Sequence, residues 1–94
     1  MLFRSRRDDG ERGAARDLTT QEQALFDALR TLRRAIANEL SVPPFLVFSD
    51  ATLDEMARAR PRSAAEFLRV KGVGQKKLEA FGERFLAEVR AHAP

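Results

Sequence analysis

The chain has 94 residues, with 17 Lys and Arg against 14 Asp and Glu, a net charge of +3 and no cysteine. That length allows one small domain, and the lack of cysteine excludes disulfides and thiolate–metal sites and favours an intracellular location. No run approaches the ~20 apolar residues that cross a bilayer, so we expect no membrane partner.

The first eighteen residues differ in character from the rest of the chain. Residues 1–18 crowd charges of both signs together with two glycines and show no apolar periodicity. Such a segment cannot bury enough apolar surface to fold, which predicts a flexible charged linker or tail. Its five arginines are nearly cancelled by four acids, so we do not place phosphate contacts there. The folded domain is therefore expected over residues 19–94.

An amphipathic helix is expected next, and it carries the longest apolar stripe of the chain. It is expected to start at Thr19 or Thr20, where Thr20 and Gln23 have the spacing of a capping box. The stripe recurs at intervals of three and four residues, at Leu25, Leu29, Leu32, Ile36 and Leu40. Pro43-Pro44 ends the helix, because proline lacks the N–H donor and restricts the residue before it.

Four further elements complete an all-α pattern. Residues 45–48 are apolar and have no partner strand elsewhere, so we expect a short helical turn that fills the core. A helix capped by Ser49 or Asp50 follows to about Arg60, with Leu53, Met56 and Ala57 inward. A second capping box, Ser63 with Glu66, opens a short helix, and a last helix runs from Gly74 to about His92. The prediction is a compact bundle of four main helices and one short turn.

The turn before the last helix is the strongest candidate for a binding site. Gly72-Val73-Gly74 lets the backbone turn sharply and approach a ligand, and the next helix begins with free N–H groups. The only three lysines of the chain surround this turn, at Lys71, Lys76 and Lys77. A helix N-terminus beside cations attracts phosphate. The alternative is an ordinary helix–helix turn whose lysines pair with Glu66, Glu79 or Glu83.

Other polar groups give weaker signals. Arg33 and Arg34, with Arg30, form a basic strip on the first helix that could extend a phosphate track, or a solvated face paired with Asp27 and Glu39. Carboxylate pairs occur without histidine or cysteine beside them, so we expect no metal, no cofactor and no acid–base chemistry. The Gly-x-x-x-x-Gly-Lys-Ser/Thr phosphate loop is missing as well. The chain is therefore not expected to be an enzyme.

Three separated segments together resemble one known family. Residues 42–53, with Pro43-Pro44 and Phe45-Leu46-Val47-Phe48, resemble the signature of the HRDC domain, which is shared by RecQ-type helicases and RNase D. Residues 68–74 and 77–86 resemble the family's second signature, a Gly-Val-Gly turn followed by a Lys, an aromatic-Gly pair and a Phe-Leu pair. The match spans residues 22–92, and the double-proline segment favours the RecQ side of the family.

The resemblance implies a five-helix bundle that does no chemistry itself and helps a helicase engage single-stranded or branched DNA. At the position of Phe45, RecQ relatives commonly carry an aromatic residue, usually tyrosine, that contributes to DNA contact. Phenylalanine retains the ring for base stacking without the hydroxyl. The alternative from the residues themselves is that Phe45 belongs to the core, as we expect for Phe48.

The residue patterns and the family resemblance together predict a monomeric accessory domain that binds DNA weakly and without sequence preference. Phosphate would be held by Lys71, Lys76, Lys77 and the amides around Gly72 and Gly74, with base stacking on Phe45 and further contacts from Arg33 and Arg34. Two alternatives stay open: a module that docks on a helicase core or repair partner, and an RNA-binding domain of the RNase D kind. The expected location is the cytoplasm, on the nucleoid in a bacterium, and any ATP hydrolysis would belong to another domain of a parent chain.

Overall fold

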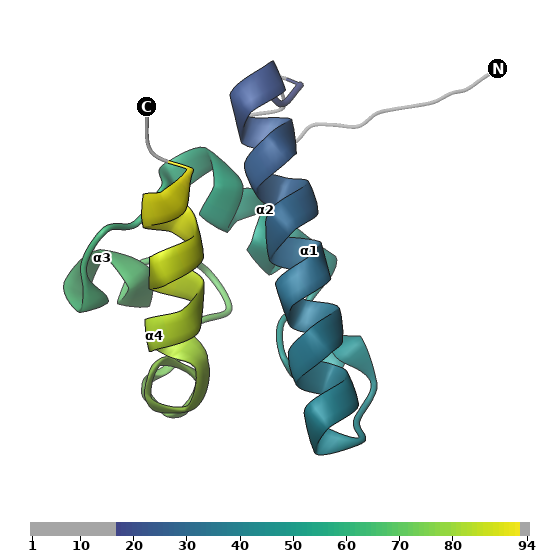
Figure 1. The fold of residues 1–94 in the computed structure, drawn as a ribbon. Helices are drawn as coiled ribbons and strands as arrows, with labels where there is room; N and C mark the ends of the chain where they lie inside the picture. The colour runs from purple at the N-terminus through teal and green to yellow at the C-terminus, as the bar shows by residue number, and fades with distance from the viewer. Residues whose placement is uncertain (1–16, 93–94) are drawn as a thin grey trace, which may run out of the picture.

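The computed structural model describes residues 17–92; residues 1–16 of the predicted linker and residues 93–94 lie outside the described part. The elements are α1 (Thr20–Leu40), the 3-10 turn η2 (Pro44–Leu46), α2 (Asp50–Ala59), α3 (Ala64–Leu68) and α4 (Gln75–Ala91) (Figure 1). No strand occurs between residues 17 and 92, and the predicted all-α fold with one short helical turn is confirmed.

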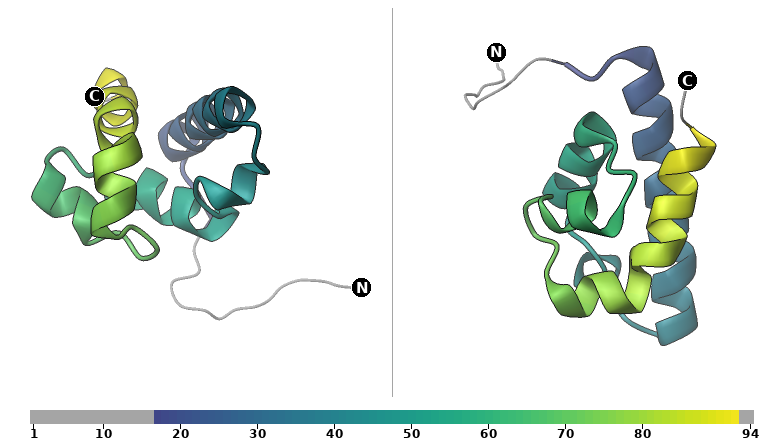
Figure 2. Two further views of the ribbon diagram at one scale, coloured as in Figure 1. Left: turned by 90° about the horizontal axis from the view of Figure 1, so that it is seen from below. Right: turned by 90° about the vertical axis from the view of Figure 1, so that its left-hand side faces the viewer.

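The two long helices form the frame of the domain. α1 contacts α2, η2 and α4, and α3 packs on α4. Figure 2 shows α1 and α4 together on one side of the molecule, with α2 on the other. None of the helices in the described part is both long enough and apolar enough to cross a membrane.

Phe48 lies at the centre of the core, as predicted, with 2% of its surface exposed. Its ring meets three others edge-on, with centroid distances of 6.0 Å to Phe67, 5.9 Å to Phe81 and 4.9 Å to Phe85. Edge-to-face contacts of this kind stabilise aromatic pairs beyond the area they bury. The segment between η2 and α2 is thereby joined to α3 and α4.

The helix starts follow the predicted capping chemistry, with one shift. Thr19 caps α1 and forms the capping box with Glu22, so the predicted pair of Thr20 and Gln23 was wrong by one residue. Ser49 caps α2 by accepting from the N–H of Thr52, as expected. The Ser63 hydroxyl caps α3 as well, but the Glu66 carboxylate accepts from the N–H of Arg62 rather than from the cap residue.

The apolar positions predicted to face inward on α1 are buried or partly buried, except for the last one. Leu25, Leu29 and Ile36 are buried and Leu32 packs partly against them, whereas Leu40 is 53% exposed. At about 100° per residue Leu40 still falls on the side of α1 that carries Leu29 and Ala37, but it is the last residue of the helix, where the packing ends. The prediction that Leu40 faces inward was therefore wrong.

The turn between α3 and α4 rests on α2. Gly72 has φ +94°, and a Cβ placed there would lie 2.2 Å from the Thr52 hydroxyl oxygen. The N–H of Lys71 donates to the Glu55 carboxylate at 3.0 Å. Both a left-handed backbone and the closeness of α2 therefore require glycine at position 72.

An ion pair connects the end of α1 to α4. The Arg84 guanidinium donates to both carboxylate oxygens of Glu39, at 3.0 and 3.2 Å. This hydrogen bonding and the charge of Arg84 hold the pKa of the Glu39 carboxyl below its ordinary value, and Glu39 raises the pKa of Arg84 in turn. Since both groups lie at the surface, salt screens the attraction.

We expect Gly72→Ala to lower the free energy of unfolding by about 1–3 kcal/mol, because alanine there is strained and meets Thr52. Gly74→Ser is the matched control, since a Cβ at Gly74 has no atom within 4 Å and serine can cap α4. Urea denaturation of both variants measures the difference. Equal stabilities would contradict the account of the turn.

We expect the carboxyl carbon of Glu39, followed by NMR through a pH titration, to titrate below an ordinary glutamate. Arg84→Gln should return its pKa to the usual range. Because the pKa is lowered in the folded state, the pair stabilises the domain above the ordinary carboxyl pKa, and this contribution is lost as pH falls through the lowered value. An unchanged titration in Arg84→Gln would disprove the coupling.

Candidate nucleic-acid interface

The start of α4 offers hydrogen-bond donors that have no acceptor. Gly74 is the N-cap residue and has no side chain to accept from the first turn. The first bond of the helix is that of Leu78 N–H to the Gly74 carbonyl, and within residues 17–92 the N–H groups of residues 75–77 have no acceptor. Such groups carry the partial positive charge of the helix terminus.

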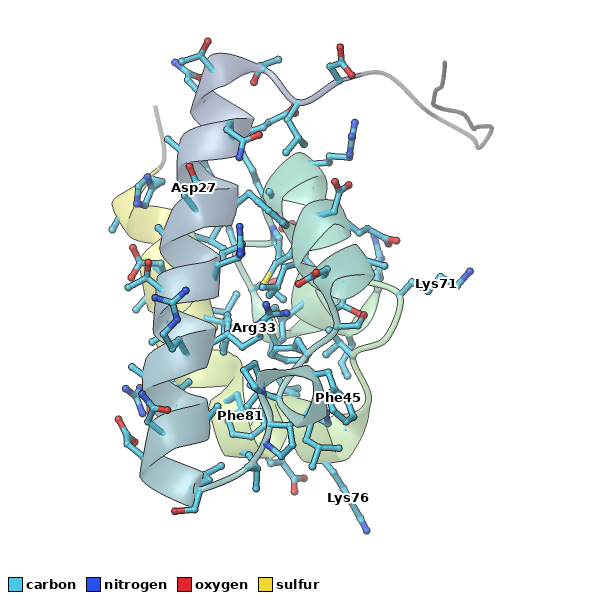
Figure 3. All side chains as sticks on the ribbon, turned by 90° about the vertical axis from the view of Figure 1, so that its right-hand side faces the viewer. Asp27, Arg33, Phe45, Lys71, Lys76 and Phe81 are labelled. Atoms are coloured by element: carbon cyan, nitrogen blue, oxygen red, sulfur yellow. The ribbon has the colours of Figure 1, made fainter. Side chains whose placement is uncertain are left out.

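Two of the three lysines near the turn are free. Lys71 and Lys76 are exposed, and in the described part of the chain no ion pair or hydrogen bond engages their ammonium groups. Figure 3 shows both side chains extending away from the body of the domain. The alternative pairing with acids is not observed: Glu66 accepts from the Arg62 N–H, and Glu79 accepts from Gln75.

Lys77 differs from the other two, because its ammonium group points into the protein. Nζ donates to the carbonyls of Leu46 and Val47, at 2.6 and 2.7 Å, and lies 5.5 Å from the centroid of the Phe48 ring. The phosphate contact expected of Lys77 therefore competes with partners that it already has.

Phe45 lies at the middle of η2 and is 66% exposed, so the alternative that placed it in the core was wrong. Leu46 beside it is 50% exposed. Figure 3 shows Phe45 on η2, in the lower half of the view, with Lys76 extending from the same end of the domain. The exposed ring is accessible to a base, and stacking on it stays a prediction.

The basic strip expected on α1 separates into two environments. The Arg33 side chain is only 11% exposed and donates to the Phe48 carbonyl at 2.9 Å and to the Asp50 carboxylate at 2.8 Å. Arg34 is exposed and has no such partner among residues 17–92. The acids proposed as alternative partners are engaged elsewhere, since Asp27 accepts from Gln23 and Glu39 from Arg84.

The inward direction of Lys77 and Arg33 was missed at the sequence level, although a signal for it was present. Lys77, Phe81 and Phe85 follow one another at intervals of four, so they share the inward face of α4. Arg33 likewise lies four residues from both Leu29 and Ala37, which are buried on the inward side of α1. Within residues 17–92 no group of His, Cys, Asp or Glu could hold a metal ion.

Comparisons with known proteins agree with the resemblance drawn from the sequence. The family model of the HRDC domain matches residues 22–89. Over 71 residues, 76% of this chain, the sequence is 48% identical to ATP-dependent DNA helicase RecQ of Haemophilus influenzae. The corresponding values for RecQ of Bacillus subtilis are 47% over 74 residues and 79% of this chain. In both cases the match covers 12% of the relative, so the chain spans about an eighth of their length.

Two further similarities extend the comparison. ATP-dependent DNA helicase UvrD2 of Mycobacterium tuberculosis is 35% identical over 69 residues, which are 73% of this chain and 10% of that protein. The solved structure of D. radiodurans RecQ HRDC domain 3 superposes with a TM-score of 0.73 at 41% identity, covering 74% of this chain and 92% of that domain. This chain therefore belongs to the HRDC domain family.

Proposed function

We propose that this chain is a non-catalytic accessory domain that binds DNA weakly through phosphate contacts and tunes the substrate choice of a RecQ-like helicase. The observation that carries the proposal is the joint exposure of the Phe45 ring and of the free side chains of Lys71 and Lys76 around the turn before α4. The domain would act as a monomer in the cytoplasm, on the nucleoid in a bacterium.

Phosphate would be held at the turn before α4. Free N–H groups after Gly74 lie at the positive end of the helix dipole, and phosphates bind readily at such ends. Lys71 and Lys76 would add two mobile charges, and Arg34 on α1 would extend the contact. Gly72 contributes by holding the turn against α2.

Phe45 would stack on a base, which requires that the base be unpaired. Base–aromatic stacking is worth about 1–3 kcal/mol and does not depend on which base is present. Nothing among these groups is arranged to read base edges, so binding would be independent of sequence. Single-stranded or branched DNA is therefore the expected ligand.

The names of the relatives favour DNA over RNA as the ligand. The RecQ and UvrD2 proteins described above are ATP-dependent DNA helicases, and this chain matches only a small part of each. In a parent protein of that kind, ATP hydrolysis would lie in other domains.

A second candidate function is docking on a protein, and the exposed apolar pair of Phe45 and Leu46 favours it. The natural partner would be the helicase core of the parent chain or a repair protein. An apolar pair would bind such a surface with little dependence on salt, whereas phosphate contacts weaken steeply as salt rises. Salt dependence therefore separates the two functions.

We expect a labelled single strand of about 20 nucleotides, longer than the site of one such domain, to bind at low salt in a fluorescence anisotropy titration. Lys71→Ala/Lys76→Ala should weaken binding and reduce the slope of log K against log salt by roughly 1.4, or 0.7 for each phosphate that is no longer neutralised. The same strand made of RNA should bind no more tightly than DNA.

Arg90→Ala is the control for loss of charge, because it removes one charge, together with a bond to the Arg62 carbonyl, at the far end of α4, about 20 Å from Lys76 along the helix axis. It should leave the affinity nearly unchanged. Absence of binding at low salt, or an equal effect of Arg90→Ala, would overturn the proposal. The labelled domain would then be titrated against a RecQ helicase core, where loss of binding in Phe45→Ala would support docking.

A further inference from the structure

Three consecutive backbone carbonyls next to Phe45 are held by two cationic side chains from different helices. Lys77 of α4 donates hydrogen bonds to the carbonyls of Leu46 and Val47, at 2.6 and 2.7 Å. Arg33 of α1 donates to the Phe48 carbonyl at 2.9 Å. We call this arrangement of Lys77, Arg33 and the three carbonyls the carbonyl clamp. It fixes the segment that follows Phe45 from two sides.

The carbonyl clamp satisfies groups that the local backbone cannot. In η2 the N–H groups of Leu46 and Val47 donate to the carbonyls of Pro43 and Pro44, each at 3.0 Å. The next carbonyls have no further helical turn above them. Those of Val47 and Phe48 belong to buried residues, where a carbonyl without a partner is costly, whereas the Leu46 carbonyl lies at the surface. A charged donor makes a stronger bond to such an oxygen than a neutral one.

Lys77 and Arg33 each destabilise their surroundings in one respect, which argues that each has a specific role. A lysine in the first turn of a helix opposes the helix dipole, and Lys77 is the third residue of α4. The Arg33 Nε atom is buried and has no hydrogen-bond partner within the described part. Each side chain is thus retained in an unfavourable setting while it donates to the segment that follows Phe45, and Arg33 also pairs with the Asp50 carboxylate at the start of α2.

We propose that Lys77 and Arg33 are positioning residues that keep the Phe45 ring at the surface, and that neither is a phosphate ligand. Two ammonium N–H groups of Lys77 are directed to carbonyls and the group lies over the Phe48 ring, so its charge is turned inward. This inference rests on the proposed function for its effect on DNA, but the positioning itself is independent of DNA.

The DNA test compares Lys77→Met with Lys76→Met by anisotropy over a series of salt concentrations. Removal of a phosphate ligand lowers the salt slope by about 0.7, whereas removal of a positioning residue lowers affinity and leaves the slope unchanged. Lys76→Met should show the first pattern. Lys77→Met should show the second, with affinity reduced on the order of tenfold, as expected when one base no longer stacks.

A double-mutant cycle sharpens this test. If Lys77 acts through Phe45, Lys77→Met/Phe45→Ala should bind no worse than the weaker of the two single variants. Lys76→Met/Phe45→Ala should instead show the product of the two separate losses. Additive losses for Lys77→Met, or a reduced salt slope, would overturn the proposal and return Lys77 to the phosphate ligands.

A test without DNA separates this inference from the proposed function. In Lys77→Met and Arg33→Met, hydrogen exchange at the amides of Leu46 and Val47 should accelerate about tenfold or more, while the Phe85 amide in the core keeps its protection. Unchanged exchange at Leu46 and Val47 would overturn the positioning role even if DNA binds. If wild type does not bind DNA, accelerated exchange would still support positioning while the proposed function fails.

Lys77→Gln is the second variant, for use if Lys77→Met loses the Phe85 protection and so fails to fold. Its amide keeps two N–H donors without the charge, so exchange at Leu46 and Val47 should lie between wild type and Lys77→Met. Its salt slope should equal that of wild type although a cation has been removed. A slope reduced by about 0.7 would show a phosphate contact instead.

Discussion

The rest of this domain depends on the contacts that the buried Phe48 ring makes in the core. Its ring meets Phe67, Phe81 and Phe85 edge-on, so one residue from the segment between η2 and α2 joins α3 and α4. The backbone that carries Phe48 must then pass close to the core, and its carbonyls must find donors there. Lys77 and Arg33 supply those donors. The exposed position of Phe45, three residues earlier, follows from this anchoring.

Much of this arrangement was predictable from the sequence, because local chemistry and apolar spacing agree with the final packing. Ser49 and Ser63 capped their helices and Gly72 provided the left-handed turn, as residue types alone indicate. The α1 helix ended before Pro43-Pro44, as expected, but at a left-handed Ser41 that the sequence did not indicate. The two errors in α1 have simple causes. Thr19 and Thr20 compete for one cap, and Leu40 is the last residue of α1, where the apolar spacing continues but the packing ends.

The candidate site was predictable only in part, since the sequence reports charge but not which way a long side chain points. Lys71, Lys76 and Lys77 look equivalent around the turn, yet the first two are free and the third donates to the backbone. Arg33 and Arg34 are likewise neighbours with opposite environments. Helical spacing places Lys77 and Arg33 on inward faces, but the carbonyls that they bond lie about 15 to 31 positions away in the chain, so these acceptors could not be predicted.

The partners of the carbonyl clamp are main-chain atoms, and this has a consequence for how the site can change. A backbone carbonyl is present whatever side chain a residue carries. Substitution at position 45 therefore leaves every bond of the carbonyl clamp in place. The identity of the exposed side chain can change without a change in the backbone that carries it. The backbone that positions residue 45 is thus independent of the side chain there. Tyrosine, tryptophan or a cation at that one position would change the exposed group, and with it the ligand preference, on an unaltered fold.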